Sequence, residues 1–145
     1  MLEASTVIGQ ANFDLMKSFL SRLIGTWDID TGGTRVGIVT YSSTVGSGFN
    51  LGDHLSVSLL QSAIMSLSFS GGSTNTVAAL EHVRNMMLTA KAGARVDVPK
   101  VVVMLSAGPS DDVQATQVYC NRSSKNSVHM ILITLIHEQS NVFKN

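Results

Sequence analysis

The segment Gly71-Gly72-Ser73-Thr74 has a composition suited to a phosphate loop, because glycine lets backbone N–H groups approach an anion closely. No lysine follows Thr74 to complete such a loop. The chain also lacks a Gly-x-Gly-x-x-Gly dinucleotide fingerprint after a strand and a Gly-x-Ser-x-Gly nucleophile elbow. We therefore interpret the segment as a loop that carries Thr74 to the rim of a sheet.

The other side chains with catalytic or metal-binding potential are scattered along the sequence. A single cysteine, Cys120, excludes an internal disulfide and a multi-cysteine metal site. Asn121-Arg122-Ser123 matches the N-glycosylation acceptor pattern, so Asn121 is a modification site if the chain enters the secretory pathway. The four histidines lie on separate segments without metal-ligand spacing and are interpreted as surface or packing residues: His54, His82, His129 and His137. No acid–base pair emerges, and we predict that the protein is not an enzyme.

Apolar residues recur at helical spacing in several segments. In the first, Phe13 and Phe19 belong to the apolar side and Lys17 lies between them, which predicts an amphipathic helix that packs on a sheet. Capping residues and glycine stops give the expected ranges: Gly9 to Gly25, Asp53 to about Leu67, Thr74 or Thr76 to before Gly93, and Ser110 or Asp111 to about Asn121.

Strand-like runs alternate with these helices. Four are expected: Arg35 to Tyr41, a weaker Val45 to Asn50 joined to it by a hairpin, Pro99 to Ser106, and Val128 to Ile136. The Pro99 to Ser106 run is valine-rich and apolar on both faces, which is typical of a buried parallel strand. Ligands of such sheets bind beyond the carboxyl ends of the strands, where Ala107 lies. The fold class is therefore α/β, a three-layer sandwich whose sheet is mainly parallel with one antiparallel edge strand.

Composition excludes several classes of partner. The 145 residues suit one domain, and 44% hydrophobic with 14% charged residues describes a globular chain. A formal net charge of zero gives no basic field for nucleic acid or anionic lipid. No apolar run approaches the about 20 residues of a membrane span, and Met1 to Ser5 lacks the regions of a signal peptide. We expect neither nucleic-acid binding nor membrane insertion.

Three segments together resemble the von Willebrand factor type A domain, above all the versions repeated in collagen type VI chains. They are Ser5 to Phe13, Ser70 to Thr76 and Val101 to Gly108, with Arg35 to Ser43 as a fourth. The resemblance gives a partial domain over residues 1–136 and a divergent tail over 137–145. It implies an extracellular adhesion or matrix-assembly module that binds proteins such as collagens, and it leaves the oligomeric state open.

Domains of this family hold a divalent cation through an Asp-x-Ser-x-Ser segment, a threonine and a second aspartate. The resemblance places Glu3, Ser5, Val7, Thr74 and Ala107 at these positions, and only Ser5 and Thr74 keep the family's residue types. Two hydroxyls and one lengthened acid offer too little charge to offset the dehydration of magnesium or manganese. We therefore predict no bound metal, and binding through the rim loops or helix surfaces.

Asp111 and Asp112 lie a few residues beyond Ala107 in the same loop. Either acid is an alternative to the missing aspartate, and both also suit the capping of the following helix.

The resemblance further implies that a central first strand is nearly absent and that C-terminal elements are missing. Losing about five or six buried aliphatic side chains removes roughly 10 kcal/mol, which matches a whole domain's net stability of about 5 to 15 kcal/mol. We therefore expect marginal stability or aggregation, which a cooperative melt above about 50 °C would contradict. The alternative to an adhesion module is a non-functional truncated fragment or relic-gene product.

Overall fold

One mixed sheet organises the molecule. The computed structural model describes residues 1–107, 110–118 and 128–134. The strands follow the order β3-β2-β1-β4-β5 across the sheet. β3 pairs antiparallel with β2 at one edge, and every other neighbouring pair is parallel. The predicted sheet type is confirmed, with these bounds: β1 (Leu2–Glu3), β2 (Ile38–Tyr41), β3 (Val45–Phe49), β4 (Lys100–Ser106) and β5 (Val128–Thr134).

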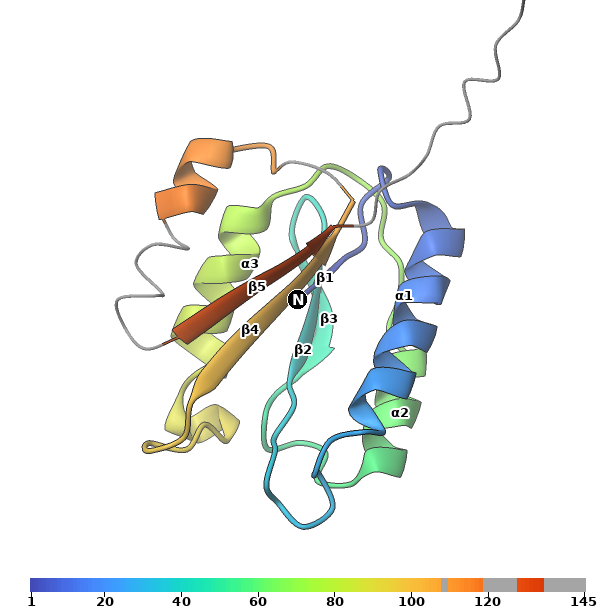
Figure 1. The fold of residues 1–145 in the computed structure, drawn as a ribbon. Helices are drawn as coiled ribbons and strands as arrows, with labels where there is room; N and C mark the ends of the chain where they lie inside the picture. Colours follow the sequence, from blue (N-terminus) through green and yellow to red (C-terminus); the bar gives the residue numbers. More distant parts are fainter. Residues whose placement is uncertain (108–109, 119–127, 135–145) are drawn as a thin grey trace, which may run out of the picture.

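Helices lie on both faces of this sheet (Figure 1). One face carries α1 (Gly9–Ile24) and α2 (Val57–Met65), and the other carries α3 (Thr76–His82). A π-helical turn, η1 (Val83–Met87), continues α3, and a 3-10 turn, η2 (Ala90–Ala92), follows it. Residues 113–118 form a further helical segment. The layers are those of the predicted three-layer sandwich.

Two helix caps differ from the sequence prediction. α2 begins after Ser56, whose hydroxyl accepts from the Leu59 N–H, whereas the Asp53 carboxylate accepts from the Asn50 N–H in the preceding turn. The helical segment 113–118 is capped by Asp112, which accepts from the Ala115 N–H at 2.8 Å. Asp53, Ser110 and Asp111 were therefore wrong as caps, because neighbouring polar residues compete for the same orphan N–H groups and only local geometry decides between them.

Apolar packing is divided between the two faces. Leu2 and Leu105 of the sheet pack with Phe13 of α1 and Leu60 of α2 on one face. On the other face a separate cluster of buried apolar side chains packs together: Val39, Val83, Met87, Val102 and Val128. Phe19, predicted on the apolar side of α1, is instead 41% exposed. The packed stripe of the helix is therefore narrower than its apolar pattern. The expected burial of β4 on both faces holds at Met104 and Leu105, whereas Val101 is 53% exposed.

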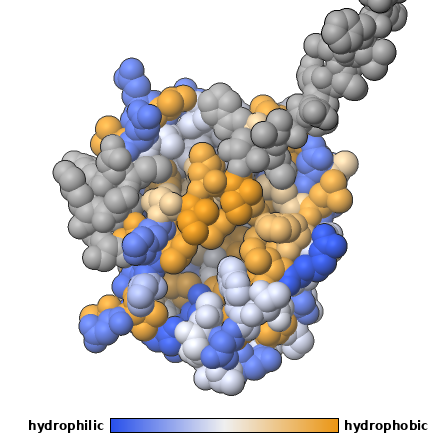
Figure 2. All heavy atoms as spheres, viewed as in Figure 1, coloured by the Kyte–Doolittle hydropathy of each residue, from blue (hydrophilic) through white to orange (hydrophobic). Residues whose placement is uncertain are grey.

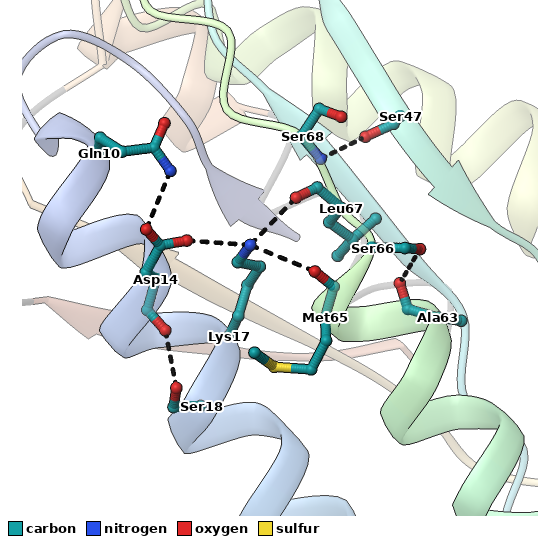
Figure 3. Close-up of polar contacts among 10 residues, drawn as sticks. All are labelled: Gln10, Asp14, Lys17, Ser18, Ser47, Ala63, Met65, Ser66, Leu67 and Ser68. Atoms are coloured by element: carbon teal, nitrogen blue, oxygen red, sulfur yellow. Dashed lines mark hydrogen bonds and ion pairs between the residues drawn. The ribbon is translucent and has the colours of Figure 1, made fainter.

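Lys17 is buried, although its place in the sequence suggests the polar side of α1. Its Nζ forms an ion pair with Asp14 at 2.9 Å and donates to the carbonyls of Met65 and Leu67, each at 3.3 Å (Figure 3). It also lies 5.3 Å from the ring centroid of Phe13. Because Met65 ends α2, the ammonium group supplies a cation and donors where helix carbonyls lack partners, and it joins the two helices.

Replacing Lys17 by methionine keeps the apolar stem and removes the charge and donors. We expect the Lys17→Met variant to lose about 1–3 kcal/mol of unfolding free energy, the range for charge-assisted hydrogen bonds at a buried site. Urea denaturation followed by circular dichroism measures the loss. Arg22→Met, at an exposed position of α1, is the matched control and should change stability by no more than about 0.5 kcal/mol. Equal losses in the two variants would contradict a special role for Lys17.

Candidate binding site at the sheet rim

Three segments distant in sequence converge at the carboxyl edge of the sheet. Glu3 is the last residue of β1 and Ser106 the last residue of β4, and these strands run parallel. The loop that precedes α3 brings Thr74 to the same edge. The side chains of Glu3, Ser5, Thr74 and Ser106 are all buried there, with relative exposures of 0 to 4%. A parallel sheet places its strand ends together in this way, so this edge is the candidate site.

The carboxylate of Glu3 is the centre of this cluster. Its Oε1 accepts hydrogen bonds from the hydroxyls of Ser5 at 2.5 Å and Thr74 at 2.8 Å. Its Oε2 accepts from the Ser106 hydroxyl at 2.6 Å and from the backbone N–H of Ala107 at 3.0 Å. Four donors from four positions therefore satisfy both oxygens of a fully buried acid, which is the condition for keeping such a group in a protein interior.

Glycine shapes the loop that delivers Thr74. Gly72 has a φ of +91°, and a Cβ built there would lie 2.4 Å from the Ser43 hydroxyl oxygen, so a side chain is excluded on both counts. The Gly72 N–H donates to the Thr6 hydroxyl at 2.8 Å, and the Ser73 N–H donates to Ser43 at 2.9 Å. The loop thus bonds to the segments after β1 and β2, which fits its interpretation as a carrier of Thr74.

Asp111 contacts the backbone of Thr74 rather than its side chain. Both carboxylate oxygens accept from the Thr74 N–H at 3.2 Å, and the Asp111 N–H donates back to the Thr74 carbonyl at 3.0 Å. Asp111 is exposed, and its contact is with the backbone of Thr74. The acid therefore positions the threonine loop, while Asp112 caps the following helical segment.

Other residues singled out in the sequence lie elsewhere. Val7 is 67% exposed on the segment between β1 and α1. The His54 ring packs edge-on against Phe49 with centroids 4.9 Å apart, as expected of a packing histidine. Cys120, Asn121 and His137 lie outside the described residues. Of the five positions that the resemblance implies, the rim cluster thus includes the side chains of Glu3, Ser5 and Thr74 and the backbone of Ala107.

The donor set does not fit a divalent cation, the group that the family resemblance implies. Ser5 and Thr74 direct their hydroxyl hydrogens at Glu3 Oε1, and Ala107 directs an N–H at Oε2. Magnesium and manganese need hard oxygen ligands with free lone pairs and more than one negative charge nearby. Among the described residues at this edge, Glu3 has the one buried carboxylate, and the positive ends of hydrogen-bond donors surround it. The cluster is an internal hydrogen-bond network.

Sequence reasoning missed two members of this region. Ser106 ends an apolar strand, and a polar residue at that point was a usable signal for a rim contact. Tyr41 is fully buried, and its hydroxyl makes no hydrogen bond of good geometry with the described residues, although Ser106 and Thr76 lie beside it. Burial above all, and then the charge of Glu3, raise the pKa of Tyr41 from 10.0 to about 12.

The raised pKa of Tyr41 predicts an alkaline loss of stability. The folded state favours the neutral phenol, so its contribution is complete below pH 10, the pKa in the unfolded chain, and is lost as pH rises through about 12. A shift of about two pKa units corresponds to about 3 kcal/mol. Tyr41→Phe should therefore lose less stability than the parent between pH 10 and 12 in urea unfolding. Tyr119→Phe measures the contribution of the other tyrosine, and equal alkaline losses in the parent and Tyr41→Phe would contradict the assignment.

Comparison with known proteins places this geometry in context. The family model of the von Willebrand factor type A domain matches residues 1–142. The chain is 36% identical over 140 residues to von Willebrand factor A domain-containing protein 2 of Xenopus laevis, covering 97% of this chain and 18% of that protein. It is 34% identical over 114 residues to the collagen alpha-4(VI) chain of Mus musculus, covering 77% of this chain and 5% of that one. The chain thus spans less than a fifth of either relative.

A solved structure shares the fold. Proximal thread matrix protein 1 from the mussel byssus, solved with a zinc-occupied metal-ion-dependent adhesion site (MIDAS) motif, superposes with a TM-score of 0.82 at 22% identity. The match covers 92% of this chain and 36% of the mussel protein. In the part of the chain that the structure describes, no helix is long and apolar enough to cross a membrane.

Proposed function

Because the chain belongs to the von Willebrand factor type A domain family, we propose that it is a non-enzymatic interaction module that binds extracellular-matrix proteins, collagens among them, without a metal ion. Two similar proteins carry a matrix role in their names, a collagen chain and a thread matrix protein. By the same relationship we assign the module to the extracellular matrix.

The four hydrogen bonds of Glu3 are the observation that supports metal independence. In a cation-dependent site the ion links the rim loops and leaves a coordination position for an acidic group of the partner. Here the Glu3 carboxylate links the β1 end, the β4 end and the threonine loop directly. The rim is therefore organised before a partner arrives, which lowers the entropic cost of binding.

The outer surface of this rim favours a different partner chemistry. Val7 exposes an apolar side chain, and Asp111 and Asp112 expose carboxylates on the loop beside Thr74. Among the described residues of the rim, Val7, Asp111 and Asp112 supply no positive charge for an acidic group of a partner. A partner that presents an apolar side chain flanked by lysine or arginine complements it.

Binding to immobilised matrix proteins tests the proposal. The purified chain is passed over collagen VI and fibrillar collagen surfaces in magnesium-containing buffer and again in EDTA, with surface plasmon resonance as the readout. We expect saturable binding whose Kd changes by less than twofold between the buffers. Val7→Asp should weaken it at least fivefold, whereas Val96→Asp, at an 85% exposed valine in the loop before β4, should leave it unchanged.

Two results would overturn parts of this proposal. Binding that disappears in EDTA would contradict metal independence. Absence of binding to any of the surfaces by a cooperatively folded chain would favour the alternative of a fragment without binding activity.

A further inference from the structure

The loop between η2 and β4, residues 93–99, lies at the amino end of β4 and thus at the opposite end of the sheet from the rim (Figure 1). Val96 and Asp97 form a turn within it. Val96 is 85% exposed, the largest value among the large apolar side chains of the described residues, and Val98 is 36% exposed. Figure 2 shows apolar and hydrophilic side chains that project together at the lower left, where this loop lies. We call residues 96–98 the valine–aspartate turn.

Asp97 differs from the other acids of the described residues in its lack of an intramolecular partner. Within residues 1–107, 110–118 and 128–134 its exposed carboxylate forms no hydrogen bond and no ion pair. The other acids in this part of the chain each interact with another group of the protein: Glu3, Asp14, Asp28, Asp30, Asp53, Glu81, Asp111 and Asp112. The Asp97 carboxylate is therefore available to a second molecule.

The base of the loop is fixed by hydrogen bonds. The Arg95 guanidinium donates two, each of 2.8 Å, to carbonyls of the segment before β2. From that segment Arg35 donates in turn to the Gly93 carbonyl at 2.7 Å. After the turn, Pro99 restricts its own φ and the backbone of Val98. A loop that is ordered before binding loses less conformational entropy in a complex.

Basic residues accompany this acid. The segment 91–100 contains Lys91, Arg95 and Lys100 but only one acid, Asp97. Its net positive charge attracts an acidic partner surface and repels a basic one. An acidic surface also repels the Asp97 carboxylate at the point of contact, unless a cation lies between the two. Protein sites for hard divalent cations combine these features, because carboxylates surround an ion that accepts a further oxygen ligand.

We propose that Asp97 is a ligand for a divalent cation held by a partner protein, where its carboxylate fills a coordination position that the partner's own ligands leave open. The acidic ligands of the partner face the basic residues around the valine–aspartate turn. Val96 and Val98 are covered in the contact, and the exclusion of water strengthens the attraction between the ion and the carboxylate. The ion belongs to the partner, so this recognition is separate from the metal-independent binding proposed for the rim.

A chelated metal ion tests the proposal on the complete chain. The probe is the manganese complex of nitrilotriacetate, in which the chelator leaves coordination positions of the octahedral ion open. It is titrated into isotope-labelled protein and followed by two-dimensional NMR, since the unpaired electrons of manganese broaden the amide signals of nearby residues. We expect the Val96 and Val98 signals to broaden at least fivefold more than the Asp53 and Asp112 signals.

Two matched variants separate Asp97 from other exposed acids. Asp97→Asn keeps the size of the side chain and removes its charge, and it should reduce the broadening at Val96 and Val98 at least fivefold. Asp53→Asn removes an exposed acid whose carboxylate accepts from the Asn50 N–H, and it should leave that broadening unchanged.

Several results would overturn the proposal. They are equal broadening beside all exposed acids, broadening that persists in Asp97→Asn, and no broadening at Val96 and Val98 with millimolar chelate. The peptide acetyl-Lys-Lys-Lys-amide is the competing probe. If it shifts the Val96 and Val98 signals and the chelate does not broaden them, the turn fits a basic partner and the proposal fails.

Discussion

The Glu3→Ala variant is expected to lose about 3–5 kcal/mol of unfolding free energy, because it removes the acceptor of four buried donors and leaves a cavity. The Ser5, Thr74 and Ser106 hydroxyls can turn toward other partners, but the Ala107 N–H is fixed by the backbone. Guanidinium denaturation at neutral pH measures the loss. Asp97→Ala, at an exposed acid before β4, is the control and should change stability by no more than about 0.5 kcal/mol.

Glu3→Gln gives a graded version of the same test. The fixed Ala107 N–H needs an oxygen at the Oε2 position, so the amide nitrogen must lie at the Oε1 position. Its neighbours there are two hydroxyls, which can reverse and accept. We therefore expect a loss of about 1–2 kcal/mol, clearly less than in Glu3→Ala. A Glu3→Ala variant within about 1 kcal/mol of the parent would contradict a central role for the carboxylate.

The second large effect concerns the α-amino group of Met1. Burial lowers its pKa from 8.0 to about 5. Between these values the unfolded chain binds a proton that the folded chain does not, so the stability of the chain beginning at Met1 rises with pH. Below pH 5 the buried amino group lowers the unfolding free energy by its full amount, and above pH 8 it does not lower it. Three pKa units correspond to about 4 kcal/mol.

Urea unfolding at half-unit steps from pH 5 to 8 measures this dependence. The N-acetylated chain is the control, because an amide at Met1 keeps the donor to the Val103 carbonyl and carries no titratable proton. Its stability should rise by about 4 kcal/mol less than that of the free amine over this interval. Parallel pH profiles for the two forms would contradict the assignment.

The fold was predictable because its signals are repetitive. Valine-rich β4 and the apolar side of α2 each carry their signal over many residues, so tertiary contacts reinforce the local pattern. Helix caps depend on single side chains among polar neighbours, and there the prediction failed at Asp53. Lys17 was misplaced for a related reason, since the carbonyls that bind its ammonium group, those of Met65 and Leu67 at the carboxyl end of α2, are about fifty residues away in the sequence.

The sequence predicted where the rim site lies, but it predicted only part of the contacts within the site. The residue types at Glu3 and Ala107 indicated a poor cation site, and that interpretation remains a prediction about metal binding. What the sequence did not reveal is that the longer acid reaches Ser106 and the Ala107 backbone across the sheet. Hydrogen bonds between strand ends depend on the register of the two strands. For β1 and β4 this register is set by one residue pair, Leu2 with Leu105. The order of residue types along the sequence does not reveal the register between two strands that are distant in the sequence.

Calorimetric titration of the chain with magnesium and manganese tests the central claim most directly. If the Glu3 network replaces a cation, neither metal should give saturable heat at millimolar concentration, and neither should alter the melting temperature. Saturable micromolar binding that disappears in Thr74→Ala would contradict the claim, because it would show that this rim holds a metal through its threonine.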